Sequence, residues 1–251
     1  MMFPKYTAIC PQGVYQLVTE VSKKQTDTFG RMRIGDLARQ MQTITEQHLN
    51  QSLGISIDEL NASGKSWVIA WTQMNIIRLP ECGEKILLRI WQGKNKAVMY
   101  SRKYAFYTMT GEPLVTTSSL FLLMDRDTRG MAVPPDQMKT IQPAKIEGEP
   151  DHPKMRMVFP SEYRNKVQRV VMPEEIDFNG HLNNSHYLDW VEEILDESYT
   201  RDHQPKSVWV QYSKELMEGQ EVHLRFEWKG DTMYLCGSER ETEAFLLQIS
   251  F

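Results

Sequence analysis

The stretch from Asp177 to Trp190 holds the side chains of this chain that are best suited to chemistry, in the order Asp-Phe-Asn-Gly-His-Leu-Asn-Asn-Ser-His-Tyr-Leu-Asp-Trp. A carboxylate, an amide and an imidazole stand at alternate positions in it, as Asp177, Asn179 and His181. Carboxylate and imidazole groups can act as bases, and an amide N–H can donate to a carbonyl oxygen. Hydrolysis of a carbonyl compound needs such groups, so the stretch indicates a hydrolytic site.

The residues between and after these side chains fit an element that would hold them in place. Gly180 allows a turn or a close backbone approach inside the run. Asn183 or Asn184 is suited to capping a helix that follows. The free N–H groups of the first helical turn would then face the motif. Together with the helix dipole they favour negative charge, such as a developing oxyanion.

Other interpretations of this stretch are a turn, a calcium loop and a zinc site. An isolated Asp-x-Asn-Gly is most often a turn, and an isolated His is most often an ordinary surface or core residue. A calcium loop needs a later Glu and more carboxylates than are present. His181 and His186 are five residues apart, which is the wrong spacing for two zinc ligands on one helical face. We expect neither a metal nor another cofactor, and spacing alone leaves catalysis and a plain turn open.

Apolar spacing predicts one helix in each half of the chain. In the first half, apolar residues recur at helical intervals from Ile34 to Leu53, with Gly54 as a C-terminal cap. In the second half the same spacing joins Tyr187, Trp190, Val191, Ile194 and Leu195. Strand patterns surround both helices, at about 14–22, 66–77, 84–93, 97–109 and 114–125, and at about 167–172, 207–213, 220–228, 231–238 and 244–250.

The two halves look like copies of one unit. A shift of 150 residues places Asp27-Thr-Phe-Gly-Arg31 on Asp177-Phe-Asn-Gly-His181. The Asp and the Gly recur, but Phe29 replaces the Asn and Arg31 replaces the His. We therefore expect two similar halves, with working chemistry in the second half only.

A long helix and an antiparallel sheet in each half make an α+β layout, in which two sheets can pair edge to edge and so protect their edge strands. We place the first half at residues 1–130 and the second half at residues 167–251. Residues 131–166 are predicted to be a proline-rich linker, because six of the twelve prolines lie between residues 127 and 166.

The composition excludes several classes of partner. Hydrophobic residues make up 41% and charged residues 25% of the 251, as in ordinary soluble proteins. The formal net charge of −4 argues against a nucleic-acid partner, since phosphate binding needs a basic surface. No apolar run is long enough to span a membrane. Cys10, Cys82 and Cys236 are scattered without zinc spacing, and we expect them to be reduced thiols.

The run Asp177-x-Asn-x-His181-x-Asn-Asn-x-x-Tyr187-x-x-Trp190 resembles the signature of the fatty acyl-ACP thioesterases, the family of the plant FatA and FatB enzymes and their bacterial relatives. The segments at 67–75, 122–130 and 210–216 resemble family strands as well, so the resemblance covers residues 14 to 250. It implies a tandem, or double, hotdog fold. It also implies hydrolysis of the acyl-phosphopantetheine thioester on acyl carrier protein, which releases a free fatty acid.

Carried over residue by residue, the resemblance implies a catalytic network of Asp177, Asn179, His181 and Glu215. Plant members have a Cys after the Glu, but Leu216 stands there in this chain, so no thiol nucleophile is available at that position. Asn179 and the helix N–H groups would hold the carbonyl, and His181, oriented by Glu215, would activate water. Asp177 could be the base or a nucleophile that forms a transient mixed anhydride.

Five further residues are candidates for binding substrate. Asn183 and Asn184 lie beside the motif. By resemblance the acyl tunnel runs into the first half, where Trp67, Trp71 and Met74 are candidates for its lining. Plain core packing is an equally good explanation for each of these three.

Three other functions compete with hydrolysis of acyl carrier protein. An acyl-CoA thioesterase would have the same fold and the same residues. A hotdog dehydratase would use a His and an acidic residue, and a non-catalytic acyl-binding module would bind the ligand without releasing a thiol. The absence of a signal peptide or plant-type transit extension predicts a bacterial cytoplasmic enzyme. Both a monomer and a homodimer are open, since the tandem layout already forms an internal pair.

Overall fold

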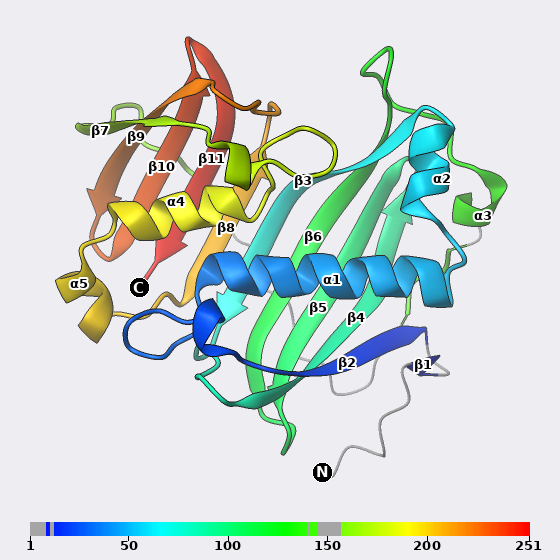
Figure 1. The fold of residues 1–251 in the computed structure, drawn as a ribbon, viewed down its shortest axis with the longest axis horizontal. Helices are drawn as coiled ribbons and strands as arrows, with labels where there is room; N and C mark the ends of the chain where they lie inside the picture. Colours follow the sequence, from blue (N-terminus) through cyan, green and yellow to red (C-terminus); the bar gives the residue numbers. More distant parts are fainter. Residues whose placement is uncertain (1–8, 11–12, 140, 145–156) are drawn as a thin grey trace.

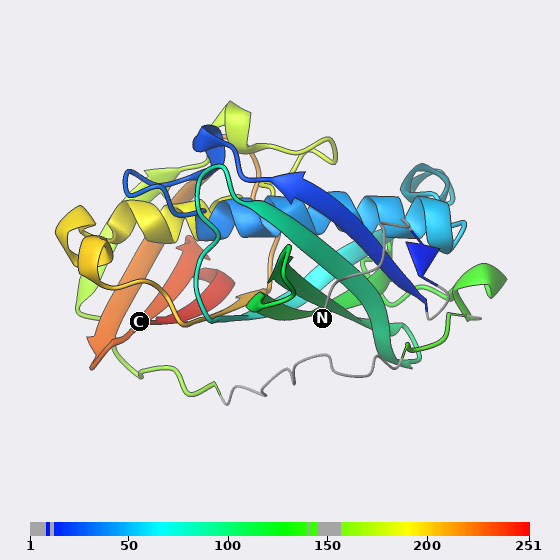
Figure 2. The same cartoon turned by 90° about the horizontal axis from the view of Figure 1, so that it is seen from below.

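The computed structural model describes residues 9–10, 13–139, 141–144 and 157–251. This part of the chain forms an eleven-stranded antiparallel sheet with the strand order β1-β2-β4-β5-β6-β3-β8-β11-β10-β9-β7. The helices α1 (Ile34–Ser52) and α4 (His186–Ile194) lie nearly end to end on the same face of the sheet (Figure 1, Figure 2). The sheet curves around α1, as Figure 2 shows.

The first half contributes α1 and the strands from β1 to β6. Its sheet is continuous through β2, β4, β5, β6 and β3, and a short helix, α2, follows α1 before the chain enters β3. The bounds are β1 Ile9–Cys10, β2 Val14–Glu20, η1 Lys23–Gln25, α2 Ile57–Ala62, β3 Lys65–Ile76, β4 Lys85–Lys96, β5 Met99–Thr108, β6 Pro113–Asp125 and α3 Asp136–Lys139.

The second half repeats this plan with shorter elements. The helix α4 is followed by α5, and the strands β8, β11, β10, β9 and β7 form its sheet. The bounds are β7 Asn165–Val170, η2 Pro173–Glu175, α5 Glu197–Asp202, β8 Ser207–Tyr212, β9 Glu221–Lys229, β10 Thr232–Glu239 and β11 Thr242–Ser250.

The two sheets join through β3 and β8, which confirms the predicted edge-to-edge pairing. The pairing is antiparallel and runs from Trp71 opposite Gln211 to Asn75 opposite Ser207. Each of these strands would otherwise end its own sheet with unpaired N–H and C=O groups. The joint therefore removes two open edges and fixes how the halves face each other.

Both helices are held by one apolar core. On α1 the residues Leu37, Met41 and Ile44 point into it at helical spacing, and on α4 Tyr187 and Trp190 do the same. The periodicity predicted both helices to within one or two residues. Gly54 has φ of +62° just after α1, as expected for a glycine that ends a helix.

The segment between the halves contains more structure than predicted. The helix α3 lies inside the predicted linker, and β7 begins two residues earlier than the strand pattern. The Ala144 N–H also donates to the Gln92 carbonyl oxygen over 2.9 Å, so this segment is tied to the first sheet. The division at residues 130 and 167 stays a prediction.

Candidate active site

The loop that carries Asp177, Asn179 and His181 is closed by backbone hydrogen bonds. The Asp177 N–H donates to the His181 carbonyl oxygen over 2.8 Å, and the Gly180 N–H donates to the Asp177 carbonyl oxygen over 3.0 Å. Asp177 Oδ1 also accepts from the N–H groups of Asn179 and His181, at 2.8 and 3.4 Å. Gly180 has φ of +80°, which glycine adopts without steric cost. The sequence thus folds locally into a tight loop that presents all three side chains.

His181 contacts Glu215, which comes from the segment directly after β8. His181 Nε2 lies 3.4 Å from Glu215 Oε2. The backbone ties the two segments together, because the Leu182 N–H donates to the Leu216 carbonyl oxygen over 2.7 Å. The Leu216 side chain is fully buried, so this position is part of the core and offers no nucleophile. The structure therefore brings Glu215 to the motif.

Asn179 is exposed at the outer side of the loop, whereas Asp177 and His181 are half-buried. The Asn179 Nδ2 lies 3.4 Å from Asp177 Oδ2, which is long for a hydrogen bond. The amide is therefore weakly held and can turn towards a carbonyl group placed next to it.

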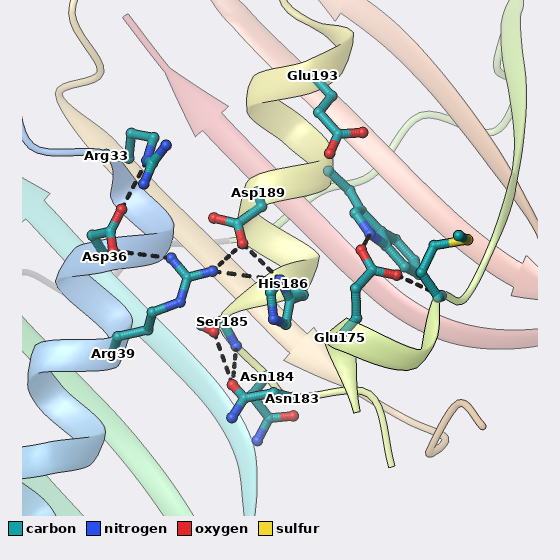
Figure 3. Close-up of polar contacts among 12 residues, drawn as sticks. Arg33, Asp36, Arg39, Glu175, Asn183, Asn184, Ser185, His186, Asp189 and Glu193 are labelled. Atoms are coloured by element: carbon teal, nitrogen blue, oxygen red, sulfur yellow. Dashed lines mark hydrogen bonds and ion pairs between the residues drawn. The ribbon is translucent and has the colours of Figure 1, made fainter. Parts of the chain in front are cut away.

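The start of α4 differs from the prediction. Its N-terminal cap is Ser185, and neither Asn183 nor Asn184 takes that position. Asn183 forms a turn before the helix. Its Oδ1 accepts from the Ser185 N–H over 2.9 Å (Figure 3). Its carbonyl oxygen accepts from the His186 N–H, also over 2.9 Å. These two N–H groups are already hydrogen-bonded, so they are not free to act as oxyanion donors. The role expected of the first helical turn as a whole stays a prediction.

Asn183 and Asn184 instead connect the motif to neighbouring elements. Gln42 of α1 donates through Nε2 to Asn183 Oδ1 over 3.0 Å. The Tyr212 hydroxyl at the end of β8 donates to the Asn184 carbonyl oxygen over 3.1 Å. Both asparagines also line the cavity described next, so they stay candidates for contact with substrate.

A cavity of about 400 Å³ opens beside the motif and has walls from both halves of the chain. Asp177, Asn179, His181 and Glu215 line its second-half side. The first-half side is formed by α1, β3 and β6, mostly with apolar side chains. They include Leu49, Trp67, Ile69 and Phe121.

A smaller cavity of about 50 Å³ adjoins the first and lies deeper under α1. The two share Ile69, Phe121 and Asn184 among their lining residues. Met74 lines the smaller cavity. The candidates Trp67 and Met74 are therefore both found at the cavity walls.

Trp71 lines neither cavity, so its assignment to the tunnel is corrected. The pairing of β3 with β6 shifts register between Ile69 and Trp71, where Ile69 lies opposite Phe121 and Trp71 lies opposite Leu120. A bulge of one residue changes which side chains face the helix. Thr72, not Trp71, then lies under α1 and lines the smaller cavity.

Arg129 is a residue of the site that the sequence pattern did not reveal. It lines the larger cavity and forms an ion pair with Glu215. Arg129 has φ of +58° in a turn after β6. Asp125 Oδ1 fixes this turn by accepting from the Thr128 N–H over 2.8 Å. The turn was recognisable from Asp-Thr-Arg-Gly, but no local pattern links it to a segment 86 residues away.

Two carboxylates set the position of α4 behind the motif (Figure 3). Glu175 accepts from the Trp190 indole N–H and from Arg169, each over 2.7 Å, and from the Met172 N–H over 2.9 Å. Burial raises the pKa of Glu175, but these three donors outweigh it and hold the pKa below its ordinary value. Glu175 is therefore a buried carboxylate that fixes the turn before the motif on α4.

Asp189 is the second of these carboxylates and joins α4 to α1 (Figure 3). It pairs with Arg39 of α1 and lies 2.8 Å from His186 Nδ1. Burial raises the pKa of Asp189, but the hydrogen bonds with His186 and Arg39 outweigh burial and hold this pKa below its ordinary value. Arg39 also pairs with Asp36 over 3.1 Å, so the two helices share a charged network.

Within the described ranges, no cluster of three or more His, Cys, Asp or Glu residues is arranged to hold a metal ion. In the same ranges, no helix combines the length and the apolar character needed to cross a membrane.

The chain matches two family descriptions, one in each half. Residues 12–141 match the acyl-ACP thioesterase N-terminal domain, and residues 161–244 match the acyl-ACP thioesterase C-terminal domain. Among curated proteins, the chain is 28% identical over 188 residues to the chloroplastic dodecanoyl-[acyl-carrier-protein] hydrolase of Umbellularia californica. That match covers 70% of this chain and 49% of the relative, so the chain spans about half the length of the curated relatives it matches.

A more distant curated relative is the chloroplastic oleoyl-acyl carrier protein thioesterase 1 of Arabidopsis thaliana. It is 22% identical over 221 residues, which cover 79% of this chain and 58% of that protein.

Two solved structures share the fold along nearly the whole chain. An acyl-ACP thioesterase from Bacteroides thetaiotaomicron superposes with a TM-score of 0.82 at 16% identity, covering 95% of this chain and 98% of that one. The 12:0-ACP thioesterase from Umbellularia californica superposes with a TM-score of 0.81 at 20% identity, covering 99% and 98%. The fold is thus the predicted α+β double hotdog. With both halves matched in order, the chain belongs to the acyl-ACP thioesterase family.

Proposed function

We propose that this chain hydrolyses the thioester of a fatty acyl group carried on acyl carrier protein, which yields a free fatty acid and the carrier thiol. The observation that carries the proposal is the contact of His181 with Glu215 beside Asn179, at one end of a cavity with apolar walls. A general base, a donor for the carbonyl and an apolar cavity are what hydrolysis of a fatty thioester requires.

His181 is the proposed general base. In a neutral imidazole one nitrogen is a donor and the other an acceptor. With Nε2 directed at Glu215, the proton is held on that nitrogen and Nδ1 is left to accept a proton from water. The water oxygen then attacks the thioester carbon, and the tetrahedral intermediate collapses by breaking the C–S bond. His181 returns its proton to the leaving thiolate.

Asn179 is the proposed donor to the carbonyl oxygen. Its amide is exposed and only weakly held, and the Ser185 and His186 N–H groups are used within the turn before α4. We therefore assign the main donor role to the side chain of Asn179.

For Asp177 the geometry favours a positioning role. Asp177 Oδ1 accepts from two N–H groups of its own loop, those of Asn179 and His181. A carboxylate used in this way keeps both side chains in place, and it is a poorer nucleophile because its charge is partly satisfied. Incorporation of oxygen-18 from water into the enzyme during a single turnover would instead assign Asp177 as a nucleophile.

The acyl chain is proposed to extend from the motif into the first half. The larger cavity leads there between Leu49, Ile69 and Phe121, and the smaller cavity continues it towards Met74. Family membership favours acyl carrier protein over coenzyme A as the carrier, and a place in the cytoplasm, where that carrier would be met, is part of the same proposal.

The test is a thiol-release assay with acyl carrier proteins that bear saturated chains of increasing length, beside the matching acyl-CoA compounds. We expect faster hydrolysis of the carrier-protein substrates. Replacing Asn179 with Ala should lower kcat by roughly a hundredfold or more and change KM much less, because an oxyanion donor acts in the transition state. Faster hydrolysis of acyl-CoA would reassign the carrier. Unchanged kcat in Asn179→Ala would overturn the role of Asn179, and binding without thiol release would overturn the function.

A further inference from the structure

A separate cavity of about 260 Å³, called the second cavity below, is lined by the loop after β2 together with residues of α4 and α5. Figure 1 shows this loop beside the two helices of the second half. It shares no lining residue with the cavities at the candidate active site. Half of the residues in its walls are apolar, and among them Leu79, Ile249 and Phe251 are buried from solvent. The other half is polar or charged and includes Arg33, Glu192 and His203.

This cavity stands where the repeat of the two halves places a second copy of the active site. The loop from Asp27 to Arg31 folds as the catalytic loop does: the Asp27 N–H donates to the Arg31 carbonyl oxygen over 2.8 Å, and the Gly30 N–H donates to the Asp27 carbonyl oxygen over 3.1 Å. Asp27 Oδ1 accepts from the N–H groups of Phe29 and Arg31, at 2.9 and 2.8 Å. Gly30 has φ of +79°.

The groups that could do chemistry are replaced at this copy. Phe29 and Arg31 stand where the catalytic loop has Asn and His. The Arg31 guanidinium is occupied by Asp27, at 2.9 Å, and by the Thr200 carbonyl oxygen, at 2.6 Å. Leu79 is the third residue after β3, as Glu215 is the third residue after β8. The copy keeps the loop and the cavity but lacks the base, its acidic partner and the amide donor.

One polar group in this cavity is left without a partner. Glu192 of α4 lines it, at the position that corresponds to Gln42 of α1. Glu192 Oε1 accepts from the Ile34 N–H over 2.9 Å, but Oε2 is buried and has no hydrogen-bond partner among the described residues. A buried carboxyl oxygen without a partner costs free energy, and a turn of the Glu192 side chain into the cavity would let a bound ligand satisfy it.

The state of this carboxyl decides what it can bind. Burial raises the pKa of Glu192 to about 8, with Asp189 and Asp36 raising it and Arg33 and the Ile34 N–H lowering it. At neutral pH the group is therefore mostly a neutral acid, with a hydroxyl that can donate and a carbonyl oxygen that can accept. The carbonyl oxygen is already used by the Ile34 N–H, so the hydroxyl is the free group. It can donate to a ligand carboxylate, and a hydrogen bond to an ionised carboxylate is stronger than one between neutral groups.

We propose that the second cavity is a non-hydrolytic binding site for a free single-chain carboxylic acid, with the carboxyl group on Glu192 and the chain against Leu79, Ile249 and Phe251. The ligand class rests on the proposed function, whose product is such an acid. The site itself rests on the cavity and on the unpartnered oxygen. It would let the chain hold a product molecule apart from the site that makes it.

The experiment is a titration of the whole chain with dodecanoic acid that carries carbon-13 in its carboxyl group, followed by NMR at neutral pH. We expect two bound carboxyl signals. Leu195→Trp, which fills the second cavity from its half-buried margin, should remove one signal, and Ile69→Trp, at the candidate active site, should remove the other. Glu192→Leu should weaken binding at the second site at least tenfold, and Glu192→Gln should weaken it less, because the amide keeps a donor and an acceptor.

Two results would overturn the inference. One is a single bound signal that Ile69→Trp abolishes. The other is a pair of signals that neither Leu195→Trp nor Glu192→Leu changes. Thermal unfolding of each variant shows whether it folds, and Leu79→Trp is a second way to fill the cavity. The NMR signals report binding and do not depend on turnover. If the protein shows two bound signals but releases no thiol, the proposed function fails and this inference still holds.

Discussion

Glu215 Oε2 is shared by two partners that come from different halves of the chain. His181 lies 3.4 Å away within the second half, and Arg129 pairs with the same oxygen from the turn after β6. Glu215 is 30% exposed and Arg129 is 57% exposed, so solvent screens the pair and it adds little to stability. Its effect is to fix the direction of the carboxylate that faces the proposed base.

Removing Arg129 should therefore reduce the rate more than the stability. We expect Arg129→Ala to lower kcat about tenfold, which corresponds to about 1.4 kcal/mol, and Arg129→Lys to restore part of the loss. The measurement is thiol release at saturating substrate, with urea unfolding as a check on stability. In a Glu215→Gln background the same change should have little further effect, because the two residues act as one unit. Additive losses would show that Arg129 acts elsewhere.

At this scale the sequence predicted the motif but not its surroundings. The types and spacing of Asp177, Asn179 and His181 are local features, and the tight loop that they form is encoded by Asp177 and a glycine. Arg129 and Gln42 approach the motif only through the pairing of the halves. No spacing along the chain records such contacts, so they could not be predicted from it.

Among the elements, the contact of α1 with α4 depends on one glycine. A Cβ atom built on Gly35 would lie 1.9 Å from Asp189 Oδ1 and 2.8 Å from its Cγ. Asp189 cannot move away freely, because Arg39 and His186 hold it. Gly35 thus allows the helices to approach at the point where their charged network forms.

Alanine at position 35 should destabilise the protein even though it is the better helix former. Helix propensity alone would favour Gly35→Ala by about 1 kcal/mol. The clash with Asp189 should reverse this and lower the free energy of unfolding by about 1–2 kcal/mol. Urea denaturation gives the value, and the control is Gly35→Ala in an Asp189→Ala chain, where the clash is gone. A higher free energy of unfolding for Gly35→Ala alone would contradict the close contact between Gly35 and Asp189.

Glu192 also lies between these helices and should make stability depend on pH. Its pKa of about 8 in the folded chain is above the ordinary value of 4.5, so the folded state holds this proton more tightly than the unfolded state. The resulting stability is fully present below pH 4.5 and is lost as pH rises towards 8. Glu192→Gln should remove this loss, on the order of 2 kcal/mol between pH 5 and 9. The free energy of unfolding of both proteins is measured by urea denaturation at each pH. An equal change with pH in the two proteins would contradict the raised pKa of Glu192.

The elements were predicted well where periodicity was long and poorly where one residue decided the outcome. Apolar residues at helical spacing over nine or more positions defined α1 and α4, and alternation defined the strands. The bulge between Ile69 and Trp71 and the cap at Ser185 each depend on a single position. A bulge reverses the faces of the following residues, which is why Trp71 was misplaced and Met74 was not.

On the scale of the whole molecule, the joint between β3 and β8 divides the proposed reaction between the halves. The second half supplies His181 and Glu215, and the first half supplies most of the cavity beyond them. The repeat in the sequence predicted two halves and one intact motif. It could not show that each loop faces the opposite half, because that arrangement follows from the pairing of the two sheets.

This division predicts that chain-length preference and chemistry can be changed separately. Ile69 lines both the larger and the smaller cavity, at the point where they adjoin. Ile69→Trp should block the passage, so that kcat/KM falls at least tenfold for long acyl chains and much less for short ones, since only long chains need the deeper space. Trp71→Phe is the matched control on the same strand, and it should leave the profile of chain lengths unchanged because Trp71 lines neither cavity. An equal loss of kcat/KM at every chain length in Ile69→Trp would show that the acyl chain lies elsewhere. The cavity in the first half would then take no part in the reaction at His181.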